Sequence, residues 1–316
     1  MTNKITIMIP TYNQAQYIKN TIDSVLMQNY SNLEIIVSDD STDNLTNELI
    51  QNQYSSELET DKIRYYHNIP SLGRVKNYYT TLYERASGDY VLNLDGDDWL
   101  SDPNYISESI AILDNNPDVM ATMARKQHYY ELKNEFTDSK GFSHLKGIVS
   151  GNEYVWETIL GKAEFNHLTV VYRRSEAIDN DFYTLNNTAS DADSIFRLIS
   201  EHKIALIDKC VGVWRLHEKN ATFTERKKTN YDELFEFEVN VYKLASYKHK
   251  KEYPYKIWMK MWKTQTVIHY LIFLLREKDK DIFRFITYLL RKEKNLLVFL
   301  PIYIFYKKIS QQGKLL

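Results

Sequence analysis

The sequence has almost no cysteine, and this absence excludes a fold stapled by disulfides. Its single cysteine, Cys210, has no partner for an internal disulfide and fits a reducing compartment. The first ten residues, Met1 to Pro10, lack a basic segment followed by an apolar stretch of signal-peptide length. We therefore expect a cytoplasmic protein.

Long hydrophobic runs are also missing. The two most apolar stretches, residues 266–275 and 296–306, are shorter than the ~20 residues of a membrane-spanning helix, and the second contains Pro301. The chain nevertheless has 316 residues, of which 43% are hydrophobic and 26% are charged. These values predict a globular protein with a sizeable core, built as one large domain or two.

Positive charge is scarce in the first three quarters of the chain. Residues 241–316 contain 17 Lys and Arg against 5 Asp and Glu, which leaves 23 basic and 37 acidic residues before them. An acidic body does not provide the basic surface that nucleic acid requires, so we expect no nucleic-acid partner. We predict a domain over residues 1–225 and a helical region, rich in basic and aromatic residues, over 226–316.

Apolar strands alternate with helices in the first hundred residues. Strand patterns cover residues 4–10, 33–37, 63–66 and 90–94, and residues with helical spacing lie between them. This alternation predicts right-handed crossover connections and a largely parallel α/β sheet flanked by helices.

Acidic residues follow two of these strands. Asp39 and Asp40 end the second strand, and Asp95, Asp97 and Asp98 follow the fourth. Open parallel sheets bind ligands at the carboxyl edge, and hard oxygen ligands there suit Mg²⁺ or Mn²⁺ carrying a diphosphate. Each acidic pair, taken alone, is more consistent with a turn or a helix cap. Together they favour a nucleotide site.

These segments resemble the family 2 glycosyltransferases, which have a nucleotide-diphospho-sugar transferase fold of the GT-A type. In chain order, the matching segments are IMIPTYN at 7–13, IVSDDSTD at 36–43, ASGDY at 86–90 and LDGDD at 94–98. The resemblance is specific over about the first 100 residues and looser to about residue 220. It implies a Rossmann-like domain and a metal-dependent, inverting transfer of a sugar from a nucleotide-diphospho-sugar.

The resemblance also implies roles for individual residues. Near the nucleobase it places the residues that follow the first and second strands: Thr11, Tyr12 and Asp40, with Asn13 and Asp39 beside them. In the acidic loop it assigns Asp97 and Asp98 to the cation, Mn²⁺ or Mg²⁺. It assigns Asp95 to the ribose or to the cation. Where the family often has Ala-Arg-Asn, this chain reads RVKN at 74–77, which leaves Arg74 and Lys76 as candidates for a phosphate contact.

Two later segments supply the remaining candidates. The segment SDADSIFRL at 190–198 resembles the family's acidic pair at the start of a helix, which makes Asp191 the candidate general base and Asp193 the alternative. By charge alone, these aspartates would simply stabilise the helix N-terminus. The segment VWRLH at 213–217 resembles a Tyr-Arg-x-His segment, so Arg215 is a candidate phosphate ligand and His217 a candidate metal ligand.

The partners follow from the resemblance and from the basic C-terminal region. Basic and aromatic residues together suit helices lying on an anionic membrane, here the inner face of the cell membrane, or a bundle packed on the catalytic domain. We expect a UDP-sugar donor and a glycan acceptor linked to polyprenyl diphosphate, in the synthesis of capsule, exopolysaccharide or O-antigen. The alternative is a catalytically inactive protein that binds nucleotide or carbohydrate, or a membrane-tethered interaction protein.

Overall fold

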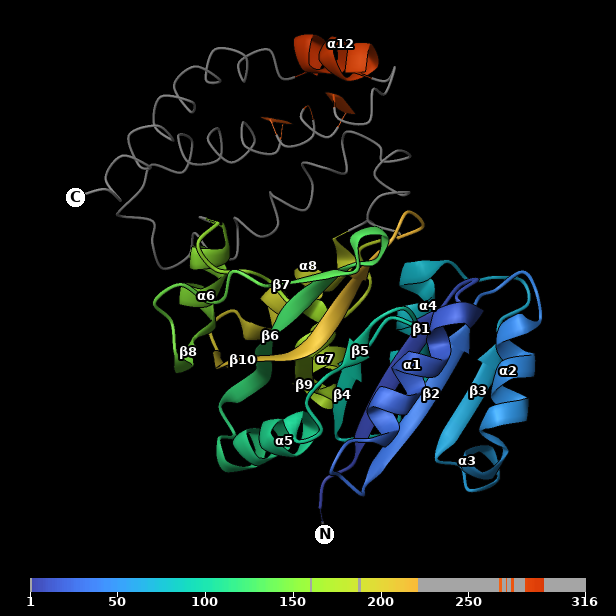
Figure 1. The fold of residues 1–316 in the computed structure, drawn as a ribbon. Helices are drawn as coiled ribbons and strands as arrows, with labels where there is room; N and C mark the ends of the chain where they lie inside the picture. The colour runs from blue at the N-terminus through green and yellow to red at the C-terminus, as the bar shows by residue number, and fades with distance from the viewer. Residues whose placement is uncertain are drawn as a thin grey trace. The chain divides into compact units, whose positions relative to one another are not determined.

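The chain divides into two compact units, Met1–Arg226 and Lys227–Leu316. The computed structural model describes residues 2–159, 161–186 and 189–220 of the first unit. In the second it describes residues 267, 268, 271, 274, 275 and 282–292. The first unit consists of a sheet with helices packed against it (Figure 1).

Ten strands of the described residues form one mixed sheet. Its order is β3-β2-β1-β4-β9-β6-β10-β5, with β7 paired to β6 and β8 paired to β10. The strands are β1 Ile5–Thr11, β2 Leu33–Asp39, β3 Ile63–His67, β4 Tyr90–Asn93, β5 Trp99–Leu100, β6 Val119–Tyr130, β7 Glu135–Asp138, β8 Gly147–Ser150, β9 Val170–Arg173 and β10 Lys203–Leu216.

Helical segments connect these strands. They are α1 Ala15–Leu26, α2 Leu45–Gln53, α3 Ser55–Glu59, α4 Arg74–Thr80, the π-helix η1 Thr81–Arg85, α5 Tyr105–Asn115, the 3₁₀ turn η2 Glu131–Lys133, α6 Gly151–Ile159, the 3₁₀ turn η3 His167–Thr169, α7 Arg174–Asp179 and α8 Ser190–Ile199.

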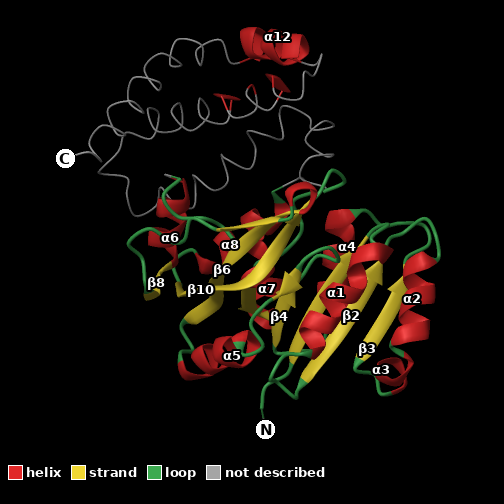
Figure 2. Cartoon of the chain, in the orientation of Figure 1, coloured by secondary structure: helices red, strands yellow, loops and turns green. Residues whose placement is uncertain are grey.

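The four strands predicted in the first hundred residues are all present and form the parallel half of the sheet. β1 lies between β2 and β4, with Ile7 opposite both Ile35 and Leu92, and β3 continues the parallel arrangement beyond β2. The arrowheads of β1, β2 and β3 therefore lie at one edge, near α4 (Figure 2). The predicted α/β architecture is confirmed, and the residues that follow these strands share one edge.

The second half of the sheet contains antiparallel pairs. β9 runs antiparallel to both β4 and β6, whereas β10 runs parallel to β6 and antiparallel to β5. Since β5 directly follows the acidic loop, its pairing with β10 brings the end of β10 to that loop. The backbone N–H of Arg215 donates a hydrogen bond of 2.9 Å to the carboxylate of Asp98.

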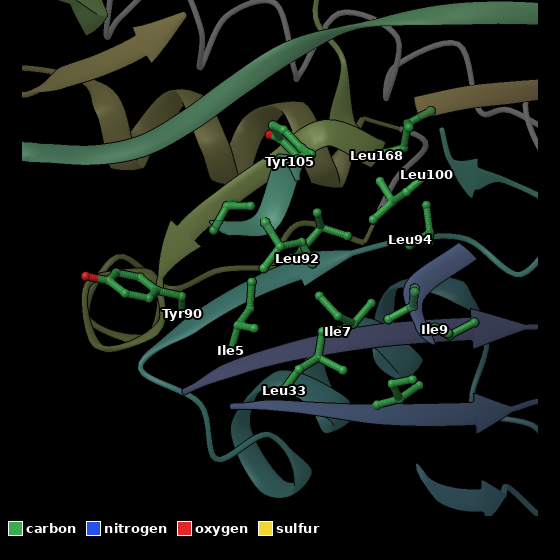
Figure 3. Packing of buried hydrophobic residues seen from close by; sticks show 14 of the residues in the cluster. Ile5, Ile7, Ile9, Leu33, Tyr90, Leu92, Leu94, Leu100, Tyr105 and Leu168 are labelled. Atoms are coloured by element: carbon green, nitrogen blue, oxygen red, sulfur yellow. The ribbon is translucent and has the colours of Figure 1, made fainter. Parts of the chain in front are cut away.

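The core lies between the sheet and its helices. All seven residues of β1 are buried, which explains why this strand is a continuous apolar run and not an alternating one. On α1, Ile18, Ile22 and Val25 have the spacing of one helix face, and all three are buried. Figure 3 shows Ile7, Ile9 and Leu92 within the same packed cluster.

A buried glutamate stabilises the amino-terminal edge of the sheet. Glu34, whose side chain is 5% exposed, forms ion pairs with Lys4 at 2.7 Å and Arg64 at 2.6 Å. Burial alone raises the pKa of Glu34, but hydrogen bonds from Lys4, Thr6 and Ser87 outweigh it and lower the pKa to about 2. The ionised form therefore stabilises the folded chain.

Glu34→Gln is expected to lower the free energy of unfolding at pH 7 by about 3 kcal/mol, because it leaves two cations without their buried anion. Since the folded-state pKa is depressed, the contribution of Glu34 is present above its unfolded pKa, 4.5, and is lost as the pH falls towards 2. Urea unfolding at pH 7 and pH 3 measures both effects. The exposed Glu59→Gln is the control, and an equal loss at both pH values would contradict the ionic explanation.

The second unit contains the helix α12, Ile282–Lys292. Phe285 and Leu289 are buried on one face, in a small cluster with Val267 and Leu274. No helix in the described part of the chain is long and apolar enough to cross a membrane. The apolar stretch predicted at 296–306 lies outside the described residues, as do five of the ten positions in 266–275.

Candidate functional site

A pocket of about 310 Å³ lies at the carboxyl edge of the parallel strands, near the lower end of the usual size for ligand sites. Segments that follow β1, β2 and β4 contribute to it, together with α4 and the end of β10. Its lining residues are Pro10, Thr11, Tyr12, Gln14, Asp40, Ser71, Gly73, Arg74, Asn77, Tyr78, Asp95, Asp97, Trp214 and Asn220.

The pocket brings together about half of the residues predicted for the site. Those that line it are Thr11, Tyr12, Asp40, Arg74, Asp95 and Asp97. Those outside its lining are Asn13, Asp39, Lys76, Asp98, Asp191, Asp193, Arg215 and His217. The contacts of each group indicate what its members do.

Asp40 fixes one wall of the pocket. Its carboxylate accepts hydrogen bonds from the side chain of Asn68 at 2.8 Å and from the backbone N–H groups of Leu72 at 3.1 Å and Gly73 at 2.8 Å. Gly73 has φ +84°, a conformation that glycine adopts without strain. Asp40 therefore holds the loop before α4 and presents its remaining acceptor capacity to the pocket.

Asn13 and Asp39 organise the turns behind these residues. The carboxylate of Asp39 accepts hydrogen bonds from the backbone N–H of Ser41 at 2.8 Å and the hydroxyl of Tyr65 at 2.7 Å. Asn13 donates its backbone N–H to the Ser41 hydroxyl at 2.8 Å. Both side chains bind protein groups, so a direct contact with nucleotide stays a prediction for them.

The acidic loop packs directly on the end of β1. A Cβ atom at Gly96 would lie 2.8 Å from the Cβ and Oγ1 atoms of Thr11, so only glycine fits at this position. Thr21 reinforces the packing, because its hydroxyl bonds the carbonyl oxygens of Gly96 at 3.0 Å and Asp98 at 2.7 Å. The loop therefore has a fixed backbone.

Asp97 and Asp98 of this loop are buried, and Asp95 is half-buried at the pocket. One oxygen of Asp97 lies 2.9 Å from Nε2 of His217 and 3.3 Å from the side-chain amide of Asn220. Burial raises the pKa of Asp95, and burial followed by the charges of Asp97 and Asp95 raises that of Asp98 well above its usual range. A bound cation would relieve this electrostatic strain.

The donor set of this loop fits a divalent cation in its chemistry, because carboxylate oxygen and imidazole nitrogen are ligands of Mn²⁺. Asp97 and His217 face each other, whereas the carboxylate of Asp98 accepts the backbone N–H of Arg215. Within the described ranges, no three Asp, Glu, His or Cys side chains form a ready ligand group. Asp97 and His217 are therefore the better-placed candidates.

Arg215 is held by the protein itself. Its guanidinium carbon lies 4.6 Å from the ring centroid of Tyr17 and 4.7 Å from that of Trp99. Its Nε donates to the carbonyl oxygen of Asp97 at 3.0 Å, and Glu131 lies 3.4 Å from Nη1. These contacts indicate that Arg215 fixes the backbone of the acidic loop, and its predicted phosphate contact stays untested.

The two candidates for a phosphate contact differ in position. Arg74 lies in the first turn of α4 and lines the pocket, whereas Lys76 is exposed and lies outside the lining. The N-terminus of a helix also carries a partial positive charge, which favours an anion. The geometry favours Arg74.

The two candidate bases also differ. The side chain of Asp191 is 23% exposed, and its Oδ2 lies 3.6 Å from Nδ1 of His167. That of Asp193 is only 4% exposed and pairs with Arg197 at 2.9 Å, one helical turn away. Asp191 is thus the more accessible carboxylate, and Asp193 has a structural partner.

Eight pocket residues were not predicted as site residues: Pro10, Gln14, Ser71, Gly73, Asn77, Tyr78, Trp214 and Asn220. Asn77 and Tyr78 could have been predicted from the sequence, because they lie three and four positions after Arg74 on the same predicted helix and so share its face. Asn220 could not have been predicted, since its position depends on a hydrogen bond that its side chain donates to the carbonyl oxygen of Arg215 at 2.9 Å.

Comparison with known families gives a match to the model "Glycosyl transferase family 2" over residues 6–181. A relative from Campylobacter jejuni, GalNAc(5)-diNAcBac-PP-undecaprenol beta-1,3-glucosyltransferase, is 32% identical over 97 residues, which are 31% of this chain and 30% of the relative. The segments that match this chain cover only 13% to 30% of the full lengths of the first curated relatives.

Solved structures share the fold. Staphylococcus aureus TarS 1-349 in complex with UDP-GlcNAc has a TM-score of 0.60 at 16% identity, with 92% of each chain covered. The mannosyltransferase PcManGT from Pyrobaculum calidifontis, in complex with GDP-Man and Mn²⁺, has a TM-score of 0.56 at 15% identity, covering 98% of this chain and 87% of that one. At such identities the likeness establishes the GT-A type fold alone.

Proposed function

This chain belongs to glycosyl transferase family 2, and from that premise we propose that it transfers a sugar from a UDP-sugar to a hydroxyl group of a glycan acceptor. The proposal rests on one observation: the same pocket contains Asp40, at the end of one strand, and Asp97, after the end of another. The first is suited to a nucleobase and the second to a cation and diphosphate.

The nucleoside would bind between the ends of β1 and β2. Tyr12 is 56% exposed and offers a ring face to a base, and Thr11 lies beside it in the lining. The carboxylate of Asp40 is an acceptor for a base N–H group. This arrangement recognises a base that presents an N–H donor, as uracil does.

The diphosphate would bind between Arg74 and the acidic loop. Asp97 and His217, with Asp98 beside them, would hold Mn²⁺ or Mg²⁺, which neutralises the charge of the departing nucleoside diphosphate. The guanidinium of Arg74, which also lines the pocket, would pair with the phosphate oxygens. We assign Asp95, whose carboxylate accepts the hydroxyl of Tyr78 at 2.9 Å, to the ribose, with the cation as the alternative.

The acceptor hydroxyl would lose its proton to Asp191 as the new bond to the anomeric carbon forms. Its partial exposure supports this role over Asp193. We infer a single displacement with inversion at the anomeric carbon.

The acceptor is proposed to be a glycan linked to a polyprenyl diphosphate. The Campylobacter relative is named for an undecaprenol-linked acceptor, and its matched segment covers about a third of this chain. We place the product in capsule, exopolysaccharide or O-antigen synthesis.

The basic C-terminal region would hold the enzyme on the inner face of the cell membrane. On α12, Phe283, Ile286 and Leu290 are exposed at 76%, 38% and 54%, with the spacing of one helix face. Arg284 and Arg291 accompany them, and α12 contains no acidic residue. Such a surface suits anionic lipid.

Replacing Phe283, Ile286 and Leu290 together by Ser is expected to weaken binding to anionic liposomes by at least about tenfold, because buried apolar area drives insertion. Flotation with vesicles of phosphatidylcholine and the anionic lipid phosphatidylglycerol measures this binding. Leu132→Ser, at an 81% exposed position of the first unit, is the matched control. Flotation of the triple variant at the level of the intact chain would contradict this membrane surface.

A panel of nucleotide sugars tests the proposed function. Donor binding and hydrolysis are measured with Mn²⁺, with Mg²⁺ and with chelator. We expect one UDP-sugar to bind and turn over only with a divalent cation. Binding without turnover on any glycan acceptor would support the inactive binding protein, and no binding at all would overturn the nucleotide site.

A further inference from the structure

Arg85 lies outside every motif of the nucleotide site, yet its side chain reaches the carboxyl ends of β2 and β3, and the segments after these strands contribute Asp40 and Ser71 to the pocket. It is the last residue of η1, a π-helical turn in which the N–H of Ala86 bonds the carbonyl oxygen of Thr81 at 2.8 Å. A π-turn holds one residue more than an α-turn, which rotates the following position by about 100° around the axis. Such turns occur often at functional sites.

The guanidinium group of Arg85 makes two directed hydrogen bonds. Nη1 donates to the hydroxyl of Ser38, at the end of β2, at 2.6 Å. Nη2 donates to the side-chain oxygen of Asn68, just after β3, at 2.7 Å. The guanidinium carbon also lies 4.4 Å from the ring centroid of Tyr66, which holds its plane.

Asn68 and Ser38, the two acceptors, each form a hydrogen bond with a residue of the pocket lining. Asn68, with its oxygen fixed by Arg85, donates its amide to Oδ1 of Asp40 at 2.8 Å. Ser38 contacts Asn77 twice, because its hydroxyl bonds the Asn77 side-chain oxygen and its carbonyl accepts the Asn77 amide at 2.9 Å. Asp40 and Asn77 both line the pocket.

The remaining capacity of Asp40 explains why its orientation matters. Among the residues that the structure describes, Oδ1 accepts hydrogen bonds from Asn68 and Leu72, whereas Oδ2 accepts one from Gly73 only. Since a carboxylate oxygen has two lone pairs, Oδ2 keeps a second position for an N–H donor. Rotation of the carboxylate would move that position away from a base.

We propose that Arg85 is a positioning residue of the nucleotide site, which orients Asp40 through Asn68 and Asn77 through Ser38 for recognition of the nucleobase. This inference rests on the proposed function, because it takes the pocket to hold a nucleoside diphosphate. Arg85 itself does not line the pocket and touches no substrate. Its effect falls on the base and leaves the diphosphate end unchanged.

Two probes separate these ends: UDP and inorganic pyrophosphate, each titrated with Mn²⁺ into the full chain by calorimetry. Arg85→Met is expected to raise the Kd of UDP by about tenfold, whereas that of pyrophosphate changes by less than about twofold. Arg85→Lys keeps the positive charge but loses the planar guanidinium that donates two hydrogen bonds. We therefore expect a Kd of UDP between those of the wild type and Arg85→Met. Asn68→Ala is expected to resemble Arg85→Met, and the double variant to add little to either.

Arg173→Met is the matched control, because Arg173 also donates side-chain hydrogen bonds beside a tyrosine ring, among them those to the carbonyl oxygens of Val119 at 3.0 Å and Leu113 at 2.7 Å. It should leave both Kd values unchanged. The inference would be overturned if Arg85→Met raised the Kd values of UDP and pyrophosphate equally, or left the Kd of UDP unchanged. If Arg85→Met does not fold, the Kd values of Arg85→Lys and Asn68→Ala decide instead. A wild-type chain that binds pyrophosphate but not UDP would overturn both proposals, whereas UDP binding without sugar transfer would overturn the proposed function alone.

Discussion

Replacing Asp97 by Asn is expected to lower sugar transfer on the order of 10³-fold and to remove the effect of Mn²⁺ on donor affinity. The carboxylate of Asp97 is the one acidic group that both lines the described pocket and faces His217, at 2.9 Å. Asparagine has almost the same shape but no charge, so the loop backbone, held by Arg215 at the Asp97 carbonyl, should remain in place. The loss of sugar transfer would then result from the missing negative charge.

Calorimetric titration of UDP with Mn²⁺ and with chelator checks this prediction. The matched control is Asp102→Asn, which removes a carboxylate that pairs with Lys209 outside the pocket. We expect the control to retain a Mn²⁺-dependent Kd within about twofold of the wild type. If Asp97→Asn kept that dependence, the cation would have to be held by Asp95 or Asp98 instead.

The acidic loop could be predicted from the sequence because its signal is local. The run before Asp95 is apolar and β-forming, and the residues after it are polar turn residues, so a buried strand ending at a sheet edge follows directly. The convergence of Asp40 and Asp97 followed from one further rule, that parallel strands present their carboxyl ends together.

The sites of Arg215 and Arg85 could not be predicted in this way, because each depends on contacts between distant segments. Arg215 lies among three aromatic rings from α1, β5 and β6, and no local pattern brings those elements together. For Arg85, helical periodicity points the side chain elsewhere, since the π-turn that redirects it has no signature in the sequence.

The second, mixed half of the sheet has the same limit. β6 and β10 are long strands that pair in parallel although 72 residues, 131–202, lie between them, and their register is irregular near Ile207 and Cys210. Their register positions Trp214 and Arg215, yet it is set by packing against β9 and β5 and not by local propensity.

Asp191→Asn is expected to lower sugar transfer by about 10²- to 10⁴-fold while the donor Kd stays within about twofold, because a general base acts on the acceptor and not on donor binding. Asp191 lies outside the pocket lining and is partly exposed at the start of α8. Initial rates at saturating donor, together with calorimetry of the donor, separate the two effects.

Asp193→Asn, two positions along the same helix, provides the internal comparison. Asp193 is 4% exposed and pairs with Arg197, so its replacement should cost about 1–3 kcal/mol of stability through the unpaired guanidinium and leave the rate per folded molecule near that of the wild type. The opposite pattern, with transfer lost in Asp193→Asn and kept in Asp191→Asn, would make the buried carboxylate the base. Because Arg197 holds that carboxylate in the folded chain, such a result would also require the ion pair to open during the reaction.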